Sequence, residues 1–470
     1  MQTSKLLNLL STFSTKEMKS FHSFLISPFH NTNEELIRFF DYLKSNHPHL
    51  SSSKLSKEVI FKYLYPNKIY KDKQIRYLMS HLLKLGKQFL LIKNLESNKV
   101  EQSLQLLNEF NKRKLNKHYQ QTRNELALYL SKNQTENTKY FLDEMKLIDL
   151  EAKYYLLQNN RLFDNKIQEG SNALDSYYVL KKLKYTCSIL NRQVFFKEDY
   201  DLNLPDYWTA WIKQNDYWSK KTIQIYTKAF LVLKFPNKLI YFENYLKLLT
   251  GKTSGVSHDD LRELFLYAIN YCLRKMREGE KNYVEKALTL YIKGIKTGAL
   301  LENGLFSPQS FSNVIKVALR LQKYNWIERF IKEYSHFLPP ASKENTLQYN
   351  LAELNCYKKD FNTALRLLSK VKFVDISYQL GSRIMLSKIY YELKEETALL
   401  SLLSSFMMFL KRNKQLSESL RKSCLNFCNL LFLIIRDKMN GIENQINNAT
   451  LLADRNWLLE KVAERRNEYQ

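Results

Sequence analysis

The chain contains little glycine and little proline. Of its 470 residues, 10 are glycine and 8 are proline, roughly a third of what typical composition would supply. Sheet-rich folds need these residues for hairpins and sharp turns, so the scarcity argues against such a fold and predicts helices joined by short polar loops. Hydrophobic residues make up 44% of the chain, which is enough for a substantial core and excludes a disordered chain.

Cysteine is scarce as well. The five cysteines are too few and too scattered for a disulfide framework. Cys424 and Cys428 stand four residues apart in an apolar helical stretch, where a free cysteine packs as a small hydrophobic residue. A metal pair is the alternative, but no histidine or further cysteine stands at ligand spacing. We therefore expect no metal site and no cofactor.

Long apolar runs are missing. The longest, Leu430 to Ile435, is far below the roughly 20 residues that a membrane span needs. The first residues hold two separate leucine pairs instead of the continuous apolar segment of a secretory signal. These absences predict no membrane insertion and a cytoplasmic location.

The motifs of common enzymes are missing too. Gly251-Lys252-Thr253 has the last letters of a phosphate-binding loop but lacks the glycine five residues earlier. The eight histidines are dispersed, and Asp259-Asp260 fits a helix N-terminus, where negative charge offsets the helix dipole. We expect no enzymatic activity and assign no catalytic residue.

One charge sign dominates. The formal net charge is +26, and the excess of lysine and arginine is spread almost evenly over the three thirds of the chain. A nucleic-acid-binding or membrane-surface protein would concentrate this charge in one patch. The even spread favours a general enrichment in lysine, and a binding patch remains the alternative.

Helix signals recur from the N-terminus onward. Residues 14–17 have the form of a capping box, and Pro28 ends the helix that follows. Asn31 repeats the cap pattern for a second helix, and Asp72 is expected to cap a long basic helix. The first hundred residues therefore predict a compact helical unit.

Three regions are expected. Residues 1–95 form an N-terminal helical domain, 96–257 an irregular helical region, and 258–470 a regular helical array closed by terminal capping helices, the last of them over 450–468. The boundary before 258 follows from residues 251–257, the densest cluster of small residues in the chain.

The most informative pattern is an internal match at an offset of 34 residues. Tyr357, Thr363, Ala364, Leu365 and Leu368 recur as Tyr391, Thr397, Ala398, Leu399 and Leu402. This period is the length of a helix–turn–helix unit that must stack on a neighbour to bury its apolar face. Asn325-Trp326 precedes Asp360-Phe361 by 35 residues and extends the array backwards. The pattern predicts an all-α fold, an α-solenoid.

These residues resemble a tetratricopeptide repeat. Ala352 is the small residue of the first helix, Asp360-Phe361 the turn, Ala364 the crossing point and Leu368 the residue between the helices. In the next unit the small Ser387 comes one residue late. The resemblance is good over about 65 residues and weak over 258–345. It implies a non-catalytic scaffold or adaptor that binds a protein or peptide, although no peptide-clamp residue can be carried over.

In that family the first helix of each pair lines the partner-binding face. Exposed residues of 311–322, 347–357 and 382–393 are therefore expected to meet a partner. Cations, amides and aromatic groups dominate there and favour an acidic segment or a C-terminal carboxylate. The candidates are Lys316, Arg320, Lys323, Tyr349, Asn350, Lys388 and Tyr391.

A second hypothesis concerns residues 54–93. A short helix, a turn and a long basic helix resemble the helix-turn-helix of winged-helix regulators, and residues 54–99 hold eleven basic but three acidic side chains. Two packed helices with solvated lysines explain the same pattern. A nucleic-acid-binding regulator would use Lys71, Lys73, Gln74, Arg76 and His81.

Overall fold

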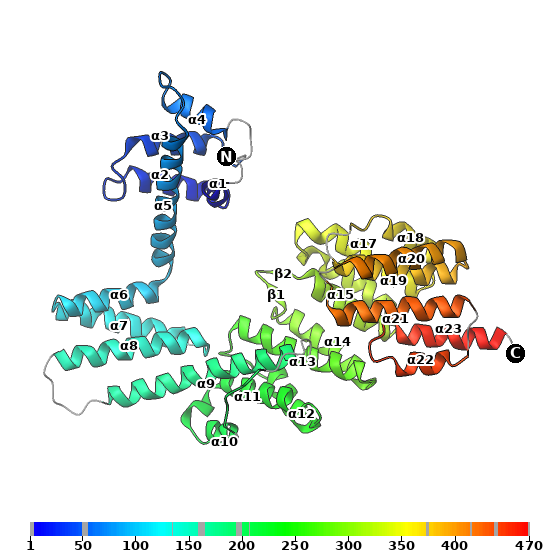
Figure 1. Cartoon of the computed structure of the whole chain (residues 1–470). Helices are drawn as coiled ribbons and strands as arrows, with labels where there is room; N and C mark the ends of the chain where they lie inside the picture. Colours follow the sequence, from blue (N-terminus) through cyan, green and yellow to red (C-terminus); the bar gives the residue numbers. More distant parts are fainter. Residues whose placement is uncertain are drawn as a thin grey trace. The chain divides into compact units, whose positions relative to one another are not determined.

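The structure of the protein, a computed structural model, is almost entirely helical (Figure 1). It describes residues 4–48, 55–133, 135–157, 165–193, 200–205, 207–372, 376–413, 416–436 and 440–468. These residues contain 23 α-helices and one two-stranded hairpin. Successive helices pack on their neighbours in sequence, so the expected all-α, solenoid-type fold is confirmed. No helix of the described residues is both long and apolar enough to cross a bilayer.

The chain divides into two compact units, residues 1–178 and 179–470. The boundaries expected at 95 and 257 lie inside these units and stay predictions about a finer division. The helices of the first unit are α1 (Lys5–Leu10), α2 (Thr15–Ile26), α3 (Glu34–Ser45), α4 (Lys57–Leu64), α5 (Asp72–Ser97), α6 (Lys99–Lys112), α7 (Asn116–Lys132), α8 (Thr138–Leu157) and α9 (Lys166–Gln193), the last of which contributes to both units.

Helices α1 to α4 pack against α5 and bury one continuous apolar core. Phe21 is fully buried at its centre. The Phe21 ring lies 4.9 Å from that of Phe40 and 5.2 Å from that of Phe89, measured between centroids. Such aromatic pairs add about 0.5–1.5 kcal/mol each beyond the burial of their area. α5 is therefore the central helix of this part of the unit.

Of the three helix caps that the sequence predicts, one is confirmed by the structure. The capping box is confirmed, since Ser14 and Glu17 each bond the other's backbone N–H. Asn31 is not a cap: its buried amide donates to the Leu25 carbonyl, and Asn33 caps α3. Asp72 is not a cap either, because it is the first residue of α5.

The second unit continues the helical array. Its α-helices are α10 (Trp208–Lys213), α11 (Lys221–Lys234), α12 (Leu239–Thr250), α13 (His258–Arg277), α14 (Asn282–Lys296), α15 (Pro308–Arg320), α16 (Tyr324–Tyr334), α17 (Pro340–Tyr357), α18 (Phe361–Leu368), α19 (Ile376–Glu392), α20 (Glu396–Arg412), α21 (Glu418–Ile435), α22 (Ile442–Asn448) and α23 (Arg455–Glu468), with short 3₁₀ helices at Asp216–Ser219 and Ser335–Phe337.

One turn type joins the two helices of five hairpins: α6–α7, α13–α14, α15–α16, α17–α18 and α19–α20. In the α17–α18 turn, Lys359 has a φ of 64°. The Lys359 N–H donates to the Cys356 carbonyl (3.1 Å) and the Asp360 N–H to the Asn355 carbonyl (2.9 Å). This is a Schellman motif, and equivalent hydrogen bonds close the other four turns. Their positive-φ residues are Lys114, Gly279, Gln322 and Lys394.

These turns correct the repeat offset. The equivalent residues Lys359 and Lys394 are 35 positions apart, so the 34-residue sequence match is out of structural register by one residue. Burial agrees, because the fully buried Ala364 corresponds to the buried Leu399, whereas Ala398 is only half-buried. Small Ser387 is fully buried and stands 35 positions after Ala352, so its apparent one-residue delay is the true register.

The backward extension of the array needs the same correction. Trp326 is the third residue of α16, whereas Phe361 is the first residue of α18. The positive-φ residues Gln322 and Lys359 show that these two hairpins are offset by 37 residues. The pairing of Asn325-Trp326 with Asp360-Phe361 is therefore wrong, although both hairpins exist.

Two small elements were missed. Strands β1 (Leu301–Glu302) and β2 (Leu305–Phe306) pair around Asn303 and Gly304, whose φ values of 52° and 76° suit a type I′ turn.

The closing segment is also more complex than one helix over 450–468, because α22 precedes α23 and α23 begins only at Arg455.

Candidate partner-binding surface

Helices α15, α17 and α19 lie next to one another in the second unit. A pocket of about 300 Å³ opens between them near the start of α15. Proline 308 and six polar or aromatic residues line it: Ser307, Gln309, Ser312, Lys316, Tyr349 and Tyr378. We call this site the α15/α17 pocket.

Lys316 and Tyr349, both predicted to meet a partner, line this pocket together. The exposed Lys316 ammonium lies 5.7 Å from the centroid of the Tyr349 ring and makes no ion pair with a described residue. Tyr349 is 5% exposed, and its hydroxyl makes no hydrogen bond within the described part of the chain. Burial raises the pKa of Tyr349 above its usual value, so the hydroxyl keeps its proton.

Asn350 is not a surface residue, contrary to the expectation. It is fully buried, and its amide donates to the Ser312 hydroxyl (2.9 Å) and to the Thr346 carbonyl (2.7 Å). Asn350 therefore joins α17 to α15 and supports the pocket wall from behind. The sequence could not reveal this, because adjacent residues on a helix point about 100° apart and only packing decides which of them is covered.

Arg320 and Lys323 are exposed, as expected. Arg320 stands one helical turn after Lys316 and makes no ion pair with any residue that the structure describes. Lys323 lies beyond the end of α15, with its ammonium 3.6 Å from the Glu285 carboxylate. An exposed pair of this kind contributes little to stability. Within α15 itself, Lys316 and Arg320 are the two cations, and we call them uncommitted because neither makes an ion pair with a described residue.

Lys388 and Tyr391 are largely covered by the C-terminal helix α23 and the residue before it. The Lys388 ammonium lies 3.0 Å from the Asp454 carboxylate and over the rings of Tyr357 and Trp457. Burial by itself lowers the pKa of Lys388, but the Asp454 charge outweighs it and the pKa is raised. Tyr391 packs edge-on against Trp457, with 5.4 Å between ring centroids.

Helix α23 is a structural cap and not a loosely held segment. Leu458 and Val462 are almost completely buried in one core with α21 and α22. Lys461 is also buried, and its ammonium lies 2.8 Å from the Glu392 carboxylate. Lys388 and Tyr391 are therefore structural residues here, and the accessible part of the predicted surface lies on α15 and α17.

Glu353 was not among the predicted site residues. Its Oε2 atom is enclosed and has no hydrogen-bond partner within the described residues. Burial raises the pKa of Glu353, whereas the nearby Lys316 opposes the rise. Glu353 stands four residues after Tyr349, on the same face of the helix, and this spacing could have identified it from the sequence.

Two of the five predicted nucleic-acid contacts, Lys71 and Lys73, are exposed and make no ion pair with a described residue. Arg76 is also exposed, but its guanidinium lies 2.5 Å from the Asp72 carboxylate. Asp72 in addition accepts a hydrogen bond from Lys57 at 2.8 Å, and this bond is the main reason why the pKa of Asp72 falls to about 2. Asp72 therefore offsets part of the positive charge at the start of α5.

The other two, Gln74 and His81, are half-buried. The Gln74 side chain contacts the Tyr65 hydroxyl, and Nδ1 of His81 is enclosed without a hydrogen-bond partner among the described residues. The groups that would read base edges are thus turned partly toward the core, so the structure does not present them as a recognition helix would.

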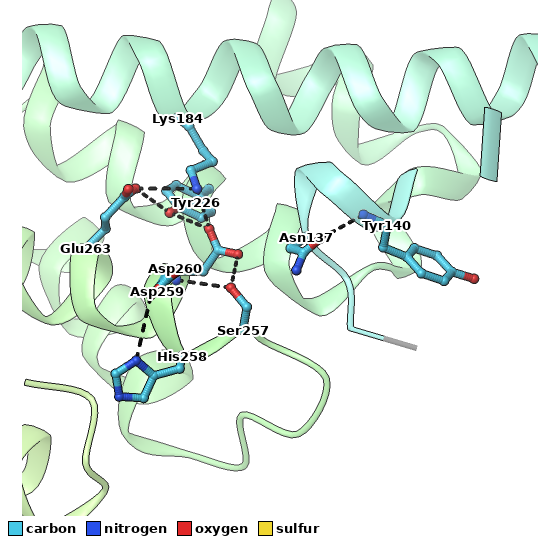
Figure 2. Close-up of polar contacts among 9 residues, drawn as sticks. All are labelled: Asn137, Tyr140, Lys184, Tyr226, Ser257, His258, Asp259, Asp260 and Glu263. Atoms are coloured by element: carbon cyan, nitrogen blue, oxygen red, sulfur yellow. Dashed lines mark hydrogen bonds and ion pairs between the residues drawn. The ribbon is translucent and has the colours of Figure 1, made fainter. Parts of the chain in front are cut away.

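A polar network joins α9, α11 and α13 (Figure 2). Asp260 is 1% exposed, and its Oδ1 lies 2.7 Å from the Lys184 ammonium and 2.9 Å from the Tyr226 hydroxyl. Its Oδ2 accepts from the Ser257 hydroxyl at 2.5 Å. The Tyr226 hydroxyl also lies 2.8 Å from the Glu263 carboxylate. Both Asp260 oxygens are satisfied, so this buried carboxylate is a junction between helices.

The network also explains Asp259 and Asp260. Ser257 caps α13, and its hydroxyl accepts from the Asp260 N–H at 3.2 Å. Both aspartates stand in the first turn, which confirms the helix N-terminus expected there. The described residues contain no group of three histidine, cysteine, aspartate or glutamate side chains arranged to hold a metal ion. Cys424 and Cys428 are buried free thiols, and burial raises their pKa values to about 11 and 12.

Comparison with known proteins gives no relative, since no family model, curated protein or solved structure matches this chain.

Proposed function

We propose that this protein is a non-catalytic scaffold or adaptor that binds a protein or peptide partner on the exposed side of α15 and α17. The observation that carries the proposal is the α15/α17 pocket together with two exposed cations of α15, one of which lines the pocket. Lys316 and Arg320 are exposed one turn apart on α15, and Tyr349 lines the same pocket as Lys316. Stacked hairpins of tetratricopeptide-like design support it, because such arrays present extended surfaces to partners.

The partner that suits this surface is acidic. Lysine and arginine form charge-assisted hydrogen bonds with carboxylates. Glu353 lies close enough to weaken the positive potential near Lys316, so Arg320 is the stronger anchor of the two. An extended acidic segment would place successive carboxylates along α15.

The proposed location is the cytoplasm. All five cysteines are free thiols, and four of them are buried, which suits a reducing compartment. The partner and the location are independent parts of the proposal.

A charge-reversal experiment tests the binding surface. The double variant Lys316→Glu, Arg320→Glu should lose most of the partners that the wild-type protein retains in a quantitative pull-down from its native cell. The matched control is Lys370→Glu, Lys411→Glu, which makes the same change in net charge at exposed residues outside α15 and α17. Both variants should keep the wild-type helical circular dichroism spectrum.

Two outcomes would reject the surface. If the α15 variant retains every wild-type partner, this face does not bind them. If both variants lose the same partners, general positive charge is responsible and not the α15/α17 pocket.

A further inference from the structure

The outward face of α5 in the first unit is unlike its inward face. Inward-facing apolar residues join the core and are almost completely buried: Ile75, Leu78, Leu82, Leu85 and Phe89. The opposite side is exposed along most of the helix. Because 26 residues of α-helix extend about 39 Å, this side is a long and straight surface.

Four cations stand on that side, and Asp72 at the start of the helix pairs with one of them. Lys73, Arg76, Lys84 and Lys87 are all exposed, and α5 has no aspartate or glutamate between Asp72 and Glu96. We call these four residues the α5 basic face.

Three of the four cations are uncommitted. Lys73, Lys84 and Lys87 make no ion pair with a described residue, whereas Lys93, which lies off this line, is paired with Glu17 at 2.5 Å. Arg76 is partly neutralised by Asp72 but keeps a 70% exposed side chain. Solvation alone explains single surface lysines, but a row of exposed cations along one side of one helix can present several charges to the same partner.

The row has a definite geometry. At 100° per residue, Lys73 and Lys84 point within about 20° of each other, and Lys87 within about 60° of Lys84. From Lys73 to Lys87 the helix advances about 21 Å. Tyr77 lies between them on the same side and is 64% exposed. The charges therefore form a line, and a linear polyanion is the partner whose charge spacing suits a line.

We propose that the α5 basic face binds the sugar–phosphate backbone of nucleic acid without reading its sequence. A duplex carries one negative charge per about 1.7 Å of its axis, so a straight row of cations can meet several phosphates at once. Contacts to phosphate fix position and carry no sequence information. The polar groups that would read bases, Gln74 and His81, are half-buried and do not stand in the row. This inference does not depend on the partner proposed for α15 and α17.

The test uses the full chain and two matched variants. The first is the triple variant Lys73→Gln, Lys84→Gln, Lys87→Gln. The control is Lys16→Gln, Lys117→Gln, Lys132→Gln, which removes the same charge from exposed lysines elsewhere in the first unit that make no ion pair with a described residue. Because all six side chains are exposed, both variants should keep the wild-type helix content and melting temperature.

Binding is measured by fluorescence anisotropy with short labelled duplexes of two unrelated sequences, between about 50 and 200 mM salt. The wild-type protein should bind both sequences with similar affinity. The first variant should bind at least about tenfold more weakly near 50 mM salt, and its plot of log affinity against log salt should be shallower by up to about 2.7, or 0.9 for each lost phosphate contact. The control should resemble the wild type.

Three results would overturn the proposal. The first is that wild-type protein fails to bind duplex DNA or RNA at low salt. The second is that both variants lose affinity equally, which would show that diffuse net charge is responsible. The third is that vesicles rich in phosphatidylglycerol retain the wild-type protein more strongly than nucleic acid does, with loss only in the first variant, which would assign this face to a lipid surface.

Discussion

Glycine placed in the helix–helix turns should stabilise this protein. Lys359 and Lys394 have positive φ values of 64° and 59° in equivalent Schellman turns. An L-residue is about 1–2 kcal/mol less favourable in the left-handed region than in the right-handed one. Glycine avoids this strain. It also lowers the stability of the folded state by roughly 0.5–1 kcal/mol, because the unfolded chain gains conformational entropy.

Each substitution should therefore raise the free energy of unfolding by about 0.5–1 kcal/mol. The two turns share no hydrogen bond, so Lys359→Gly and Lys394→Gly together should add to about 1–2 kcal/mol. The assay is urea denaturation followed by the helical circular dichroism signal, in which the midpoint should rise while the slope stays constant.

A third variant supplies the control. Lys332 is exposed within α16, where glycine should destabilise by up to about 1 kcal/mol. The same chemical change must therefore shift the midpoint in opposite directions at turn and helix positions. A lower midpoint for Lys359→Gly and Lys394→Gly would refute the left-handed geometry of these turns.

Three further predictions follow from burial and charge. Ala364 is fully buried and Ala398 half-buried, so A364W should destabilise by about 1–3 kcal/mol and A398W by clearly less; equal melting temperatures would contradict the 35-residue register. A Cβ at Gly381 would lie 2.1 Å from the Tyr349 hydroxyl, so Gly381→Ala should lower the melting temperature and change the near-ultraviolet circular dichroism, and the contact is wrong if both are unchanged. Glu17 accepts a hydrogen bond from Lys93 of α5, and this bond lowers the pKa of Glu17 from 4.5 to about 2. The contribution of this ion pair to stability is therefore present above about pH 4.5 and is lost as the pH falls toward 2. Acid titration of helix content should be less steep for Glu17→Gln over that interval, and a titration identical to that of the wild type would count against the ion pair.

The amino-acid sequence by itself determined the fold class and the position of most helices. Low glycine and proline content, apolar residues at helical spacing and local caps such as Ser14 act through the backbone within a few residues, so they can be read without knowledge of packing. The pairing of helices into hairpins was also predictable between Pro308 and Arg412, because short connections bring consecutive helices together.

The register of the repeats needed the structure. Tyr357 and Tyr391 match in type, yet the turns that follow them are 35 residues apart. A turn is set by one residue in the left-handed conformation. Lysine and glutamine occupy that position in four of the five hairpins, so the glycine that usually marks it is missing from the sequence.

Only the tertiary structure decided which predicted site residues are available. Lys316 and Lys388 look alike in the sequence, but the first remains exposed while Asp454 and Trp457, more than sixty residues away along the chain, cover the second. The basic segment shows the same limit, since Lys73 makes no ion pair with a described residue, whereas Arg76 is paired with Asp72. Whether a side chain is accessible depends on contacts between distant segments, and these contacts are fixed by packing and not by local pattern.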